Sequence, residues 1–144
     1  GFVVEFDGNH PYFHEAISAE DDLRHIRRVR YRDTRPSLPL AEMSSTELFL
    51  AKSQHWAYEN EWRIVRPLDE AVATLHSESE PYPICLFEIP RQAVTGVILG
   101  ARTQQHVVSA IKNDVATNLQ PNTVSMRRAV PDASHFLLQL IDIE

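Results

Sequence analysis

The sequence is poor in cysteine and glycine and contains no long apolar run, and each shortage excludes a class of protein. Cys85 is the only cysteine among 144 residues, so no disulfide can form within the chain, and we expect a reducing, cytoplasmic location. No apolar run approaches the roughly 20 residues that cross a bilayer and no signal peptide is visible, so no membrane partner is expected. Gly96 and Gly100 are not followed by Lys-Ser/Thr, so they do not form the phosphate-binding loop of nucleotide hydrolases.

Net positive charge is also missing, because 20 acidic residues outnumber 14 Lys and Arg and leave a net charge of −6. Such a balance argues against nucleic-acid binding through a basic surface. A small basic patch nevertheless stands out within residues 24–35, made of Arg24, Arg27, Arg28, Arg30, Arg32 and Arg35. Arginines so close together could contact phosphates locally. The alternative, which we favour, is a basic strand that faces acidic neighbours such as Glu20, Asp21 and Asp22.

The order of the expected elements indicates an α+β fold with mostly antiparallel sheet, about six or seven strands and two to four helices. One long helix is predicted near Gln104–Leu119, where apolar residues follow the helical period. Strands are expected at residues 2–6, 25–33, 57–65, 84–89, 96–100, 124–130 and 136–143. The apolar segments 84–89 and 96–100 are expected to be buried, and the first of them to be covered on both faces.

The length and the hydrophobic content of 43% fit one domain spanning residues 1–144. The chain opens at Gly1, without a methionine, directly in an apparent strand. We expect either that the sequence is a fragment or that a segment upstream of it was removed. His10 and His14 have the spacing of neighbours on a helix face, but no third ligand accompanies them, so no metal site is expected.

The stretch from residue 48 to 65 is the most unusual, since it holds both tryptophans among closely spaced charges. Just before it, Ser44 and Glu47 have the spacing of a helix-capping pair. From Ala57 onward the residues alternate as an extended strand does, which would place Glu59, Glu61 and Arg63 on one face. We therefore predict a short helix, a connector and then a strand that carries a Glu-x-Glu pair.

A Glu-x-Glu pair beside Trp and Tyr suits a cationic sugar transition state, because carboxylates stabilise developing positive charge. Two carboxylates this close raise the pKa of at least one unless a cation intervenes, and that cation could be Arg63, Lys52 or Arg66. The alternative is a non-enzymatic interaction or structural module in which Glu59, Glu61 and Arg63 form an ion-pair ladder. Hydrolysis of a glycosidic bond by the same pair ranks last, because no series of sugar-binding aromatics accompanies it.

Four segments occur in an order that resembles a known family: GFVVEFD, VRYRD, LAKSQHWAYENEWRIV, and IPRQAVTGVILG followed by a helix. The chain is similar, from Gly1 to about Leu119, to the bacterial family catalogued as domain of unknown function 2971. The most specific part of the resemblance is Lys52-x-x-x-Trp56-x-Tyr58-Glu59-x-Glu61-x-Arg63. Members usually carry a Tyr-rich opening strand and an Asn-Asp-Pro loop upstream, and both are absent from this sequence. The resemblance therefore implies that residues 1–144 are the C-terminal part of a larger domain whose upstream segment is missing.

That family resembles in turn the ADP-ribosyltransferase fold, whose members hold NAD between two small antiparallel sheets. The second resemblance implies that Glu61 is the catalytic glutamate at the nicotinamide ribose and that Glu59 orients the acceptor. It implies that Tyr31 matches the middle-strand residue. It also implies that Trp56 or Trp62 stacks on nicotinamide or adenine; the alternative is packing in the core or the sheet, which we favour for Trp62. It has no counterpart for the upstream His or Arg. The full set implied to bind a small-molecule nucleotide, with NAD as co-substrate, is Tyr31, Lys52, Trp56, Tyr58 and Arg63.

Overall fold

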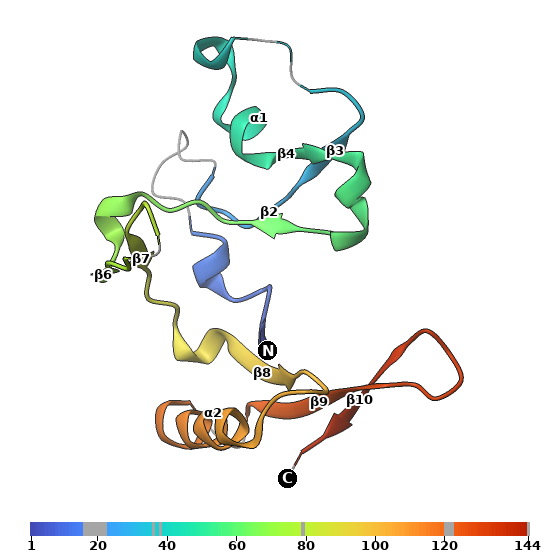
Figure 1. Ribbon diagram of the computed structural model, residues 1–144. Coiled ribbons are helices and arrows are strands. Elements are labelled where there is room, and N and C mark those ends of the chain that lie inside the picture. The colour runs from blue at the N-terminus through green and yellow to red at the C-terminus, as the bar shows by residue number, and fades with distance from the viewer. Residues whose placement is uncertain (16–22, 36, 38, 79, 120–122, 144) are drawn as a thin grey trace. The chain divides into compact units, whose positions relative to one another are not determined.

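The computed structural model describes residues 1–15, 23–35, 37, 39–78, 80–119 and 123–143. The described residues form an α+β structure, as predicted, with ten strands in four sheets and two α-helices. The contacts divide the chain into two compact units, which we call unit 1 (Gly1–His10 and Ile89–Glu144) and unit 2 (Pro11–Glu88) (Figure 1). Whether they make one domain stays a prediction. None of the described helices has the length and apolar character that crossing a bilayer demands.

Unit 1 is built on a four-stranded sheet in the order β1-β8-β9-β10, and β1 (Phe2–Phe6) is its first strand. The central strands β8 (Val94–Leu99) and β9 (Ser125–Pro131) are parallel, while both outer pairs are antiparallel. A parallel pair needs a crossover connection, and α2 (Gln105–Asn118) supplies it. The edge strand β10 (Leu138–Asp142) and α2 both match the predicted segments, and Gln104 and Leu119 cap the helix.

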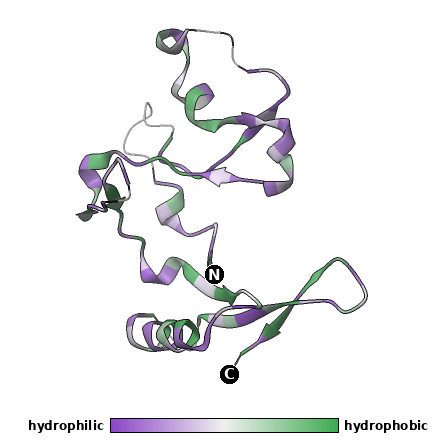
Figure 2. Ribbon diagram, in the orientation of Figure 1, coloured by the Kyte–Doolittle hydropathy of each residue, from purple (hydrophilic) through white to green (hydrophobic). Residues whose placement is uncertain are grey.

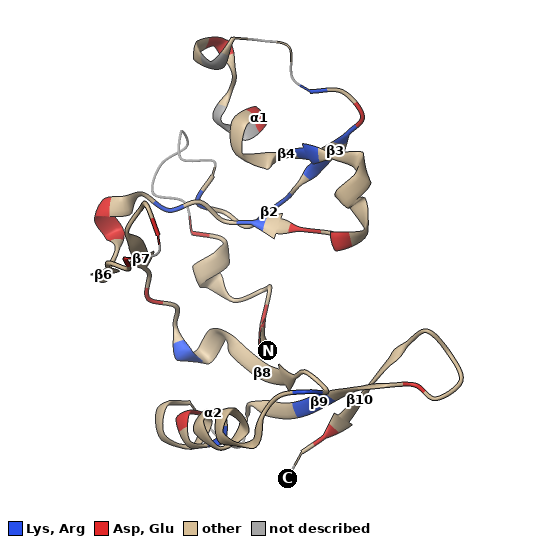
Figure 3. Ribbon diagram, viewed as in Figure 1, with Lys and Arg blue, Asp and Glu red and all other residues tan. Residues whose placement is uncertain are grey.

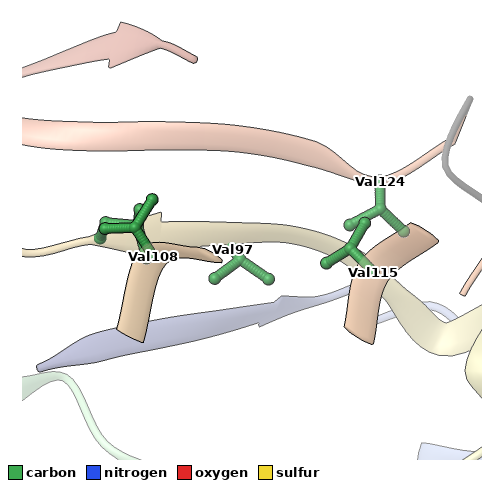
Figure 4. Packing of buried hydrophobic residues seen from close by; sticks show 5 residues of the cluster. Val97, Val108, Val115 and Val124 are labelled. Atoms are coloured by element: carbon green, nitrogen blue, oxygen red, sulfur yellow. The ribbon is translucent and has the colours of Figure 1, made fainter. Parts of the chain in front are cut away.

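The core of unit 1 forms where α2 packs against β8. Val108 and Val115 are seven residues apart and therefore share one face of the helix. They pack with Val97, Leu99 and Val124 (Figure 4), and Leu99 is fully buried. Hydrophobic and hydrophilic residues alternate around α2 (Figure 2), as expected of a helix with one face on a sheet. The predicted burial of residues 96–100 is confirmed for most of β8.

A glycine at the centre of this sheet makes room for a salt bridge between its strands. Gly96 lies between Glu5 on β1 and Ser125 on β9, and a Cβ atom there would collide with the Glu5 carboxylate and come within 2.6 Å of Ser125 Oγ. Because Gly96 has no side chain, Glu5 can extend across β8 and pair with Arg127 of β9.

The described residues of unit 2 form three two-stranded sheets, whose strands are two or three residues long. The antiparallel pairs are β2 (Arg27–Arg28) with β5 (Trp62–Arg63) and β6 (Ala73–Leu75) with β7 (Ile84–Leu86). The parallel pair is β3 (Arg30–Arg32) with β4 (Ala51–Ser53). The predicted helix start is confirmed, because Ser44 caps α1 (Ser45–Leu50) by accepting a hydrogen bond from the Glu47 amide at 3.2 Å.

Short 3-10 helices connect the strands of both units. They are η1 (Pro11–Phe13), η2 (Leu40–Glu42), η3 (Gln54–Glu59), η4 (Leu68–Glu70) and η5 (Arg91–Ala93). The strand count rises to ten instead of six or seven, because residues 25–33 form two short strands and because β4 and β6 lie outside the predicted strands.

The expected burial of residues 84–89 on both faces is wrong. Ile84 and Leu86 in β7 are 46% and 41% exposed, because β7 pairs only with β6 in a two-stranded sheet. The run is apolar enough for a central strand, but the composition of a strand does not determine how many neighbours it finds. Among the described residues of unit 2, the buried apolar side chains are Phe13, Val29 and Leu50.

Candidate functional site

The stretch predicted to be one extended strand from Ala57 folds instead as a helical turn followed by a reversal. Residues 54–59 form η3, and Asn60 then adopts the left-handed conformation with φ 47° and ψ 42°. Asparagine tolerates this region better than other residues with a Cβ atom. Its Oδ1 accepts a hydrogen bond from Arg28 Nη2 at 3.0 Å, which holds the reversal against β2. The expected Glu-x-Glu strand is therefore wrong, since only Trp62 and Arg63 are in a strand.

The reversal nevertheless brings both glutamates to the same cation. Glu59 lies at the end of η3 and Glu61 lies one residue beyond Asn60. Lys52, on β4, contacts the Glu59 carboxylate and donates to Glu61 Oε2 at 2.9 Å. The ammonium group therefore sits between the two carboxylates and offsets their mutual repulsion.

Arg63 holds the other side of the Glu61 carboxylate. Its Nε and Nη2 donate to Glu61 Oε1 and Oε2 at 2.5 and 3.1 Å, which makes the pair bidentate. Its Nη1 donates to the carbonyl oxygen of Phe49 at 2.7 Å, at the end of α1. Arg63 therefore fixes the position of Glu61 relative to both β5 and α1.

Tyr31 fixes the backbone at the same glutamate. Its hydroxyl oxygen accepts a hydrogen bond from the Glu61 amide at 2.8 Å. Tyr31 is paired in register with Lys52 across β3 and β4, so the tyrosine and the lysine approach Glu61 from neighbouring strands.

Two exposed aromatic rings border the charged groups. Lys52 Nζ lies 5.2 Å from the centroid of the Trp56 ring, within range of a cation–π contact. The Trp56 and Tyr58 rings are 6.0 Å apart with an interplanar angle of 41°, and the residues are 47% and 73% exposed. Exposed rings beside a charged cluster leave flat surfaces on which a planar base could stack.

The electrostatics of the cluster keep its central groups charged. Hydrogen bonds from Arg63 and then from Lys52 lower the pKa of Glu61 from 4.5 to about 2. The bonds to Glu59 and then to Glu61 raise the pKa of Lys52, and the bond to Glu61 raises the pKa of Arg63. The expectation that a cation intervenes between the carboxylates is met by Lys52 and Arg63, whereas Arg66 contacts Glu70 and Tyr12 instead.

The structure thus brings together the whole predicted site, which we call the carboxylate cluster: Tyr31, Lys52, Trp56, Tyr58, Glu59, Glu61 and Arg63. The sequence interpretation missed Asn60, which creates the geometry. A signal for it existed, because Asn is enriched at reversals of this kind. Over the described ranges, no group of three or more His, Cys, Asp and Glu side chains is arranged to hold a metal ion.

The arginines of the basic patch contact different partners. Arg24 is only 6% exposed and pairs with Glu70, and Arg28 bonds to Asn60. Arg32 has its Nη1 3.6 Å from Glu47 Oε1. The acidic neighbours that were expected to face the patch, Glu20, Asp21 and Asp22, lie outside the described residues.

Comparisons with protein-family models, with curated proteins and with solved structures find no match for the chain. The resemblances to the uncharacterised bacterial family and to the ADP-ribosyltransferase fold therefore stay predictions. Any function has to be argued from the carboxylate cluster itself.

Proposed function

We propose that unit 2 carries an ADP-ribosyltransferase-like site that processes NAD, with Glu61 as its catalytic glutamate. The observation that supports it best is the Glu61 carboxylate, held ionised and oriented by Arg63 and Lys52 beside the exposed ring of Trp56. An ionised carboxylate in a fixed position is the group that stabilises a positive charge developing on a sugar.

The reaction would proceed through the ribose carbon that carries nicotinamide. The bond from C1′ to the nicotinamide nitrogen breaks, its electron pair leaves with neutral nicotinamide, and the ribose takes on oxocarbenium character. Glu61 stabilises that charge, more strongly in the transition state than in the ground state. The acceptor then adds its electron pair to C1′ and gives its proton to Glu59, which the Lys52 contact holds next to Glu61.

The same electrostatics disfavour hydrolysis of a glycosidic bond with Glu61 as the acid. A general acid must be protonated near neutral pH, which requires a raised pKa. The pKa of Glu61 is lowered to about 2, so this residue suits the stabilising role and not the proton-donating one.

A second candidate is the non-enzymatic module, which a specific observation favours. Each of the four charged groups of the cluster forms an ion pair with at least one other, as in a structural network: Lys52 with Glu59 and Glu61, and Arg63 with Glu61. Under this alternative the network fixes η3 and β5 for contact with a partner. Glu61→Gln would then lower stability and change no chemistry.

Titration of NAD by calorimetry and measurement of nicotinamide release from it would test the proposal. We expect the wild type to bind NAD and to release nicotinamide, and Glu61→Gln to lose release by about a hundredfold or more while keeping its fold. Glu42→Gln is the matched control, because Glu42 is an exposed glutamate of the same unit outside the cluster, and it should behave as the wild type.

Circular dichroism and thermal unfolding check that both variants are folded, while NAD binding and nicotinamide release separate the two candidates. Loss of release by a folded Glu61→Gln supports the enzyme. A wild type that neither binds NAD nor releases nicotinamide overturns it and leaves the non-enzymatic module, because Glu61→Gln breaks the ion pairs and lowers stability under either candidate.

A further inference from the structure

A pocket with basic walls adjoins the carboxylate cluster within unit 2. It has a volume of about 360 Å³ and is lined by residues 32–35, at and after the end of β3, and by β4. The two strands are parallel and pair Arg32 with Ser53, so the pocket lies where both strands end.

The lining of this pocket suits an anion. Its lining has three basic residues, Arg32, Arg35 and Lys52, and one acidic residue, Asp33. Two of the three cations also have carboxylate partners outside the lining, since Lys52 pairs with Glu59 and Glu61 and Arg32 with Glu47. Basic residues gather along β3 and just after it (Figure 3). The hydroxyl groups of Thr34 and Ser53, which also line the pocket, add hydrogen-bond donors of the kind that bind phosphate oxygens.

The two arginines differ from the rest of the basic patch. Arg24 is nearly buried against Glu70, and Arg28 serves the Asn60 reversal. Arg32 is 35% exposed at its side chain and lies 3.6 Å from Glu47, which is longer than a hydrogen bond, while Arg35 is exposed. Arg32 and Arg35 therefore have guanidinium surface that a ligand can contact.

We infer that this pocket binds the pyrophosphate group of a small nucleotide, and that it is the anion-binding half of the proposed NAD site. Lys52 lines the pocket and also contacts Glu61, so a ligand whose phosphates occupy the pocket has its sugar next to the carboxylate. A volume of about 360 Å³ falls in the range of small-molecule pockets. The net charge of −6 disfavours a nucleic-acid strand as the ligand.

Calorimetry with inorganic pyrophosphate, with ADP-ribose and with a single-stranded RNA oligonucleotide tests this inference on the whole chain. We expect Arg32→Gln and Arg35→Gln each to weaken pyrophosphate and ADP-ribose binding by about tenfold or more, as the loss of one charge-assisted contact does. Arg30→Gln is the matched control, because it removes the same charge from an exposed position of β3 outside the pocket lining, and it should leave both affinities unchanged.

The outcomes separate this inference from the proposed function on which it rests. Pyrophosphate binding that depends on the arginines, without nicotinamide release, would support the inferred anion-binding pocket and overturn the proposed transferase activity. The opposite outcome is that pyrophosphate does not bind measurably and that Arg32→Gln and Arg35→Gln still release nicotinamide as the wild type does. That outcome would support the transferase activity and overturn the inferred anion-binding pocket. An effect of Arg30→Gln as large as that of Arg32→Gln or Arg35→Gln, or tighter binding of RNA than of ADP-ribose, would also overturn it.

Discussion

Among the described residues of unit 1 the buried side chains are alanine, valine and leucine, whereas among those of unit 2 an arginine is buried with Phe13, Val29 and Leu50. The two longest described strands of unit 1, β9 and β8, have seven and six residues, whereas no described strand of unit 2 has more than three. Short strands provide few ladder hydrogen bonds, so side chains such as Arg63 and Tyr31 bond to the backbone in their place. The comparison teaches that unit 1 depends on apolar burial, and unit 2 on polar contacts that also build the candidate site.

Truncating Leu99, the largest fully buried side chain among the described residues, should destabilise unit 1 most severely. Leu99 is fully buried, so Leu99→Ala leaves a cavity, and we expect it to lower the free energy of unfolding by about 2–5 kcal/mol in urea titrations. Leu68→Ala provides the control, because Leu68 is 72% exposed and its truncation should cost less than about 0.5 kcal/mol. Equal costs for the two variants would mean that apolar burial does not hold unit 1.

Lowering the pH should reduce the stability of unit 2, because Glu61 becomes protonated and loses its ion pairs. The folded-state pKa of Glu61 is about 2 against an ordinary value of 4.5, so its stabilisation is full above about pH 4.5 and is lost as the pH falls toward 2. We expect the wild type to exceed Glu61→Gln in stability by on the order of 1–3 kcal/mol at pH 7, a figure reduced for partial exposure.

The measurement is urea unfolding of both proteins at pH 7 and at pH 3, because Gln does not titrate. The difference in unfolding free energy between them should shrink at pH 3. A difference that stays constant with pH would show that the ionisation of Glu61 contributes no net stability.

Filling the space at Gly96 should break the salt bridge that crosses the sheet of unit 1. The new methyl group of Gly96→Ala displaces the Glu5 carboxylate from Arg127, and we expect a cost of about 1–2 kcal/mol. Glu5→Ala removes the same salt bridge, so the double variant should lose less stability than the sum of the single variants. Additive losses would place the cost of Gly96→Ala elsewhere.

The smallest expected effect comes from the reversal at Asn60. Asn60→Ala puts a less tolerant residue in the left-handed region and loses the Arg28 hydrogen bond, at a cost of about 1 kcal/mol. Asn60→Gly loses only the hydrogen bond, so it should be the less harmful of the two. Hydrogen exchange followed by mass spectrometry should show faster exchange in η3 and β5 for Asn60→Ala, with β8 unchanged.

The sequence predicted best where one period continues over many residues. The helix near Gln104–Leu119 is confirmed almost to the residue, because its apolar residues recur over four turns and choose one face. The Ser44 cap is confirmed because its signal is local. The strand at 57–60 is wrong because alternation over a few residues also fits a 3-10 turn that ends in a left-handed residue.

The residues of the candidate site could be predicted from the sequence, but their geometry could not. Charged and aromatic residues crowded near Glu61 identify the cluster, because residues so close in sequence have few ways to stay apart. What the pattern could not supply is that Lys52 would contact both carboxylates, since that contact depends on η3, on Asn60 and on the pairing of β3 with β4. The pocket at the ends of these strands depends on the same pairing.

The hydrogen bond between Tyr31 and the Glu61 amide also bears on the order of folding. It joins residues 30 positions apart, whereas the contact between Arg127 and Glu5 joins residues 122 positions apart. Closing the longer loop costs about 1 kcal/mol more chain entropy, since each doubling of loop length adds roughly 0.6 kcal/mol. We therefore expect the contacts of the carboxylate cluster to form before β1 pairs with β8 and Glu5 reaches Arg127.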